Sequence, residues 1–207
     1  MQDVRRRTRI GIIGAGPAGL LLSHLLDKEG IDSVVLESRS RTEVETTIRA
    51  GVLEHGTVNL LTDMGLGERM QREGAVHHGI ELRFDGEGHR IPLTELTNGR
   101  SIVLYPQHEV LKDLIAARLK QGGQILFNVS NVRLADITST QPVVHFAHEQ
   151  QQIELQCDFI AGCDGFHGVS RSIITAADHK VYGRDYPFGQ CCLNKRKGGK
   201  SYEIQCE

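Results

Sequence analysis

Three glycines, Gly14, Gly16 and Gly19, form the pattern in this chain with the clearest chemical meaning. They follow the apolar run Ile10–Ile13, and Glu37 closes a second apolar run further along. The order of strand, glycine-rich turn, helix, strand and acid is typical of a dinucleotide-binding unit. The three glycines permit a tight turn, close backbone approach to a pyrophosphate, and close helix–strand packing, respectively. We therefore expect phosphates at the start of the helix and a ribose hydroxyl at Glu37.

Other polar residues could complete such a site. Arg49 offers a planar fork of donors suited to phosphate or ring oxygens. Ala50 and Gly51 would let the backbone approach a flat ring closely. Gln107, at the start of an expected helix, can present its amide to a cofactor, and Asp164 ends a short apolar strand just before a turn.

Composition excludes several classes of protein. The chain has 207 residues and a net charge of −2, so it holds at least one substantial domain and has no overall basic field for nucleic acid. It contains neither an apolar run of the ~20 residues needed to span a bilayer nor a signal-peptide pattern, so we expect a cytoplasmic protein. Five cysteines without a CxxC pair argue against a disulfide framework. Metal-ligand spacing, a serine-nucleophile elbow and a P-loop lysine are also missing from the sequence.

Apolar periodicity and turn residues predict an α/β chain. The tail over 190–207 is expected to be disordered, and 38–50 to be a loop. Helices are expected over 17–29, 52–64 and 107–121, a hairpin within 79–104, and strands over 9–14, 33–37, 101–105, 124–128, 131–135, 143–148, 152–157 and 159–162.

Four segments together resemble the flavin-dependent aromatic hydroxylases. They are the glycine loop with Glu37, the run Ile48–Gly56, the run Tyr105–Val110, and Asp158–Arg171 continuing to Tyr186–Gly189. The Asp-Gly pair at 164–165 is the more specific motif of this class. The Arg-Ala-Gly-Val-Leu-Glu run narrows the resemblance to members that act on 4-hydroxybenzoate.

The resemblance implies a Rossmann-like FAD-binding domain of the GxGxxG type with part of a β-rich substrate domain. The resemblance covers residues 8 to 189. We expect that the part corresponding to the C-terminal half of full-length family members is missing from this chain. Poor solubility and weakened FAD affinity are the expected consequences. The implied segments are 1–78 and 105–178 for the FAD-binding domain, 79–104 and 179–189 for the substrate domain, and 190–207 as an unmatched tail.

The resemblance also implies a set of cofactor-binding residues, while catalytic residues stay unassigned. His167 and Arg171 match positions for NADPH phosphates; Ala18 and Thr47 depart from the usual serine and arginine. Two arginines within 38–43 could hold a 2′-phosphate, which favours NADPH, with NADH left open. The full set is Gly14, Gly16, Ala18, Gly19, Glu37, Thr47, Ile48, Arg49, Ala50, Gly51, Val52, Gln107, Asp164, His167 and Arg171.

The implied activity is the hydroxylation of 4-hydroxybenzoate to 3,4-dihydroxybenzoate with FAD, NADPH and oxygen. A catalytically inactive FAD-binding fragment has every motif visible here, so it stays open as an alternative. A nicotinamide-only Rossmann dehydrogenase is disfavoured, since it has no need of the Asp-Gly and Arg-Ala-Gly motifs. The partner is a small aromatic acid, with no nucleic acid and no membrane, and a homodimer is left open for full-length members.

Overall fold

The computed structural model describes residues 3–174, 182–184, 191–195 and 202–206. The chain divides into two units, residues 1–173 and 174–207, and the first contains all of the expected cofactor-binding residues. Within the described residues, no helix combines the length and the apolar character that crossing a bilayer requires.

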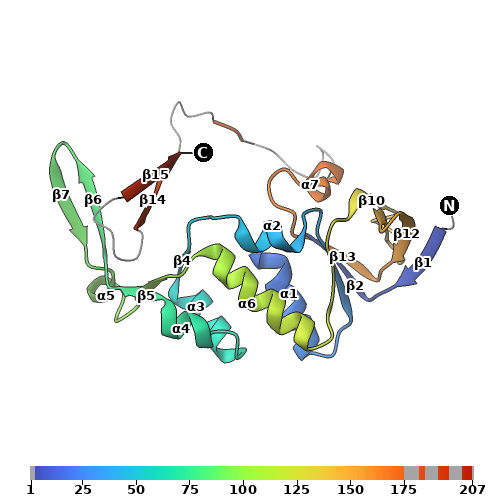
Figure 1. The fold of residues 1–207 in the computed structure, drawn as a ribbon, viewed down its shortest axis with the longest axis horizontal. Helices are drawn as coiled ribbons and strands as arrows, with labels where there is room; N and C mark the ends of the chain where they lie inside the picture. Colours follow the sequence, from blue (N-terminus) through green and yellow to red (C-terminus); the bar gives the residue numbers. More distant parts are fainter. Residues whose placement is uncertain (1–2, 175–181, 185–190, 196–201, 207) are drawn as a thin grey trace. The chain divides into compact units, whose positions relative to one another are not determined.

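A parallel sheet in the order β13-β2-β3-β9 lies at the centre of the first unit. Its strands are β2 (Ile10–Ile13), β3 (Ser33–Leu36), β9 (Gln124–Leu126) and β13 (Phe159–Gly162). Helices α1 (Pro17–Lys28) and α6 (Gln107–Lys120) lie side by side (Figure 1). One apolar core joins the sheet to both helices and includes Ile12, Leu20, Val35, Leu114 and Ile115. The expected Rossmann-like α/β fold is confirmed.

Local sequence explains where these helices begin and end. Helix α1 starts at Pro17, whose fixed φ suits the first helical position. The chain leaves α1 at Gly30 and α6 at Gly122, which take φ values of +67° and +79°. Glycine adopts such left-handed conformations without steric cost, so both helices end where the sequence predicts.

A second sheet in the order β1-β12-β11-β10 packs on the first. Its strands are β1 (Asp3–Arg7), β10 (Ser130–Ala135), β11 (Val143–His148) and β12 (Gln151–Gln156). Buried Val144, Phe146 and Leu155 form its inner face. The sequence does not predict β1, because its run of arginines has no apolar alternation; as an edge strand it keeps these charges in water.

The segment between the two halves of the parallel sheet forms small antiparallel pairs. Strands β4 (Val52–Leu53), β8 (Ile102–Leu104) and β5 (Ala75–His77) form one sheet in the order β4-β8-β5, and β6 (Ile80–Phe84) pairs with β7 (Glu87–Ile91). The expected hairpin is therefore present, whereas its assignment to a substrate domain stays a prediction. Three short helices accompany these strands: α3 (His55–Asp63), α4 (Glu68–Glu73) and α5 (Leu93–Leu96).

Several sequence expectations need correction. The expected loop over 38–50 contains helix α2 (Arg41–Thr46). This helix begins with a capping box formed by Ser40 and Glu43. The helix expected over 52–64 starts only at His55, because Val52–Leu53 pairs with β8.

In the second unit, the expected disordered tail contains paired strands β14 (Cys191–Lys195) and β15 (Tyr202–Cys206). The rest of that tail lies outside the described residues, as does the segment 179–189 except for 182–184.

Candidate cofactor site

The turn after β2 requires glycine at its first position. Gly14 takes a φ of +103°, and its N–H donates to the Leu36 carbonyl oxygen at 2.7 Å. A Cβ at this position would lie 2.5 Å from the carbonyl oxygen of Cys163 at the end of β13. The first glycine therefore lets the loop pass directly over the neighbouring strand.

The start of α1 is open to a ligand. Gly16 is the N-cap residue, no side chain caps the helix, and Pro17 occupies the first turn. The first-turn amides of this twelve-residue helix can therefore donate to an anion. Gly19 serves packing instead, since a Cβ there would collide with the carbonyl oxygen of Gly14.

Glu37 follows β3 and is a buried carboxylate, only 5% exposed. Its Oε2 accepts the Ala15 N–H of the glycine loop at 2.9 Å. Its Oε1 accepts the backbone N–H of Arg39 at 3.0 Å and the Arg39 Nε–H at 3.1 Å. Burial raises the pKa of the Glu37 carboxyl, but these hydrogen bonds outweigh it and hold the pKa below its ordinary value. The acid is thus charged and oriented at the edge of the glycine loop.

These elements enclose a cleft of about 780 Å³ at the carboxyl ends of the parallel strands. Nine residues predicted for the cofactor site line it: Gly14, Gly16, Ala18, Glu37, Thr47, Arg49, Gln107, Asp164 and His167. Six others do not: Gly19, Ile48, Ala50, Gly51, Val52 and Arg171. Open parallel sheets bind ligands at this edge, so the topology gathers residues that are far apart in the sequence.

Gly51 lies against protein backbone. A Cβ at this position would collide with the carbonyl oxygen of Tyr105 and with Pro106, and the Tyr105 N–H donates to the Gly51 carbonyl oxygen at 2.9 Å. The close approach that the sequence suggests toward a flat ring is therefore made to the segment that leads into α6. This contact ties the Arg49 run to Gln107, the first residue of α6.

A half-buried cluster of polar side chains fixes Tyr105. The Tyr105 hydroxyl accepts from Arg69 Nε at 2.7 Å and donates to Asp113 Oδ2 at 2.7 Å. Burial raises the pKa of Tyr105, so its hydroxyl keeps the proton that it donates. Arg69 also pairs with Glu109 of α6. Sequence reasoning missed this cluster, because its members come from separate elements.

The Asp-Gly segment also lines the cleft, beside the glycine loop. Asp164 Oδ2 accepts the Ser170 N–H at 2.9 Å, at the beginning of α7 (Val169–Ile173). The Arg171 guanidinium lies over the Phe166 ring, 4.6 Å from its centroid, and the His167 and Phe166 rings form a T-shaped pair with centroids 5.0 Å apart. Of the two residues expected at NADPH phosphates, His167 lines the cleft, whereas Arg171 stacks beside it.

The cleft also contains residues outside the predicted cofactor-binding set, among them Ser38, Arg39, Val44, Leu111, Cys163 and Phe166. Of these, Arg39 is one of the two arginines that the sequence suggests for a 2′-phosphate. Burial raises the pKa of Cys163, which disfavours a thiolate nucleophile at this wall.

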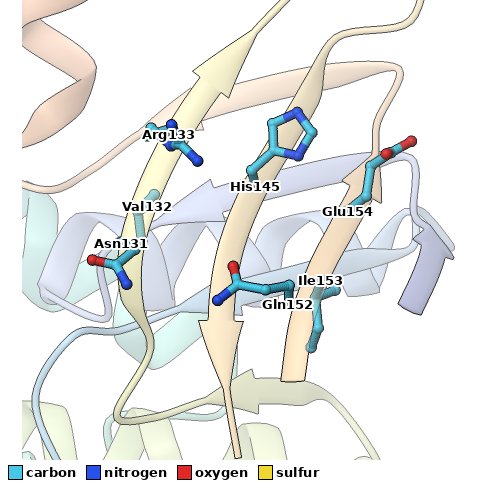
Figure 2. Close-up of a pocket in the computed structure, with 7 residues that line it drawn as sticks. All are labelled: Asn131, Val132, Arg133, His145, Gln152, Ile153 and Glu154. Atoms are coloured by element: carbon cyan, nitrogen blue, oxygen red, sulfur yellow. The ribbon is translucent and has the colours of Figure 1, made fainter. Parts of the chain in front are cut away.

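A second hollow, of about 770 Å³, lies on the outer sheet and shares only Val132 with the lining of the cleft. Figure 2 shows its polar side chains on β10, β11 and β12. Arg133 stands opposite His145, which stands opposite Glu154 on the next strand. Glu154 in turn pairs with Arg5 at 3.6 Å.

A family model described as an FAD binding domain matches residues 7–199. The chain belongs to this family. The match extends past residue 189, where the resemblance of the motifs ends. It supports FAD as the cofactor of the cleft, and the residues present fit that group. An open helix start suits the pyrophosphate, Glu37 suits a ribose, and Arg49 and Gln107 add donors on the same wall.

The names of two curated relatives describe enzymes that act on aromatic acids. The chain is 41% identical to p-hydroxybenzoate hydroxylase of Acinetobacter baylyi over 183 residues, which are 88% of this chain and 45% of that protein. It is 28% identical to 3-amino-4-hydroxybenzoate 2-monooxygenase of Streptomyces cremeus, over 81% of this chain and 42% of that protein. The chain therefore spans less than half the length of these relatives.

A solved structure shows the same fold at lower identity. P. aeruginosa PqsL in complex with 2-aminobenzoylacetate aligns with a TM-score of 0.73 at 22% identity. The alignment covers 88% of this chain and 49% of PqsL. At this identity the alignment shows a shared fold, while the family match assigns the chain to the FAD binding domain family.

Proposed function

We propose that this chain provides the FAD-binding part of a monooxygenase that converts 4-hydroxybenzoate to 3,4-dihydroxybenzoate with NADPH and oxygen. The observation that carries the proposal is the meeting of the glycine loop, Glu37, Arg49, Gln107 and Asp164 in one cleft. The 41% identity to p-hydroxybenzoate hydroxylase supports the substrate class. The reaction oxidises NADPH, places one oxygen atom of O2 on the ring and releases the other as water.

The residues of the cleft bind and orient the cofactor. Bound FAD supplies the redox chemistry between NADPH and oxygen. The amides at the start of α1 hold its pyrophosphate, Glu37 accepts a ribose hydroxyl, and Arg49 and Gln107 donate to further polar atoms of the cofactor. His167, which also lines the cleft, is proposed to contact a phosphate of NADPH.

A second candidate is an FAD-binding chain without turnover. The hairpin β6–β7 favours it, because Ile80, Leu82 and Phe84 are all exposed there. An isolated two-stranded hairpin is only marginally stable in water. Among the described residues of the first unit this apolar face is therefore exposed, whereas a substrate pocket would need it covered.

One experiment separates these candidates. The purified chain is titrated with FAD, and binding is monitored by flavin absorbance and fluorescence. The oxidation of NADPH and the formation of 3,4-dihydroxybenzoate are then measured under air, with and without 4-hydroxybenzoate. Stoichiometric FAD with substrate-stimulated oxidation and product supports the monooxygenase. FAD binding without product supports the second candidate, and absence of FAD binding contradicts both.

A further inference from the structure

The two oxygens of the Glu37 carboxylate have different surroundings. Oε1 accepts two N–H groups of Arg39, at 3.0 and 3.1 Å, and the Ser38 hydroxyl lies 3.5 Å away. Oε2 accepts the Ala15 N–H at 2.9 Å. Each carboxylate oxygen has two lone-pair sites. Oε1 is therefore saturated, while Oε2 keeps capacity for one further donor beside the glycine loop.

We infer that Arg39 is a positioning residue for the adenosine ribose, because it occupies Oε1 and leaves Oε2 to accept a single ribose hydroxyl. This inference rests on the proposed function of the cleft as an FAD site. The partner of Arg39 is then the Glu37 carboxylate, whereas the sequence suggests that the arginines of 38–43 bind a 2′-phosphate. Arg41, the other arginine of that segment, pairs with Glu45 at 2.6 Å.

Burial makes this arrangement electrostatically necessary. An ionised carboxylate as buried as Glu37 is costly unless it is paired and hydrogen-bonded. Arg39 is the cation in contact with it, at 3.1 Å. The other charged or titratable residues that line the cleft are Arg49, Cys163, Asp164 and His167. Removal of Arg39 should therefore let burial raise the pKa of Glu37, which the hydrogen bonds now hold below its ordinary value.

The test compares Arg39→Ala with Arg41→Ala as a matched control. The dissociation constant of FAD is measured for the unmodified chain and both variants from neutral pH into the acid range. We expect R39A to weaken FAD binding about tenfold at neutral pH, the effect of one charge-assisted hydrogen bond. Ribose binding needs the carboxylate, so affinity is lost as pH falls through the Glu37 pKa. In R39A this loss should begin at a higher pH than in the unmodified chain.

The control R41A should leave both the affinity and its pH profile unchanged. R39A with the affinity and pH profile of the unmodified chain would overturn the inference. If R39A does not melt cooperatively, the same measurements are made on Arg39→Gln, which keeps a hydrogen-bond donor without the charge. The result expected for it and the result that would overturn the inference are the same as for R39A. An unmodified chain that binds no FAD contradicts the proposed function itself, which distinguishes the two failures.

Discussion

Two hollows among the described residues have nearly equal volumes, about 780 Å³ at the glycine loop and about 770 Å³ on the outer sheet. The first is lined by backbone of the glycine loop, a helix start and a buried carboxylate. The second is lined mainly by polar side chains of three strands, such as Arg133 and His145. Volume therefore does not distinguish them; the fixed backbone and the buried charge do.

This difference has a physical basis. Backbone amides and a hydrogen-bonded buried acid are held in place by the fold, so a ligand meets them without ordering them first. The exposed Arg133 and the half-buried His145 would lose rotamer freedom on binding a ligand, and water screens the charge of Arg133. Substitutions in the first hollow should thus change flavin binding strongly, and those in the second should not.

The largest effect is expected for Gly14→Ala. Its Cβ would meet the Cys163 carbonyl oxygen at 2.5 Å, in a backbone conformation that alanine rarely adopts. We expect destabilisation of about 3 kcal/mol and loss of FAD binding, measured by urea denaturation and flavin titration. The control is Gly30→Ala, with a positive φ but open space around it, which should cost about 1 kcal/mol and keep FAD affinity. Equal effects of the two substitutions would show that the loop contact is unimportant.

Glu37→Gln should have the next largest effect, although the side chains have nearly equal size. Both carboxylate oxygens accept N–H groups, so a glutamine must place its own NH2 against Ala15 or against Arg39. An unsatisfied buried group costs about 1–3 kcal/mol. We expect FAD affinity to fall about a hundredfold in isothermal titration. Glu45→Gln, at an exposed ion pair with Arg41, serves as the control, and a wild-type affinity for E37Q would contradict the role of the acid.

Tyr105→Phe tests the support of the cleft and should have a moderate effect. It removes the hydroxyl between Arg69 and Asp113 but keeps the ring and the backbone bond to Gly51. We expect thermal unfolding to show a loss of about 1–3 kcal/mol. FAD affinity should change less than in E37Q, because the cleft residues themselves remain. A larger loss of affinity than in E37Q would place the cluster in direct contact with the cofactor.

The smallest effect is expected for His145→Ala and Arg133→Ala in the second hollow. Both side chains lie on the outer sheet, and neither lines the cleft at the glycine loop. FAD and NADPH titrations should give values indistinguishable from the unmodified chain. A weakened affinity for either cofactor would break the comparison and make the second hollow part of the site.

Local sequence determined the framework of this site. The glycines, Pro17 and the apolar runs act through backbone conformation and burial within a few residues, so strands, helices and the place of Glu37 follow from them. The Ser40–Glu43 capping box was also readable, although helix α2 is too short to show a period.

Only the tertiary structure decided which residues meet. It placed Gly51 against Tyr105, Glu37 against the Ala15 N–H, and Arg69 on the Tyr105 hydroxyl. It also made the arginine-rich segment Asp3–Arg7 an edge strand, through pairing with β12 far along the chain. Such contacts depend on the packing of separate elements, and a pattern of spacing along one segment contains no information about the segment that lies opposite.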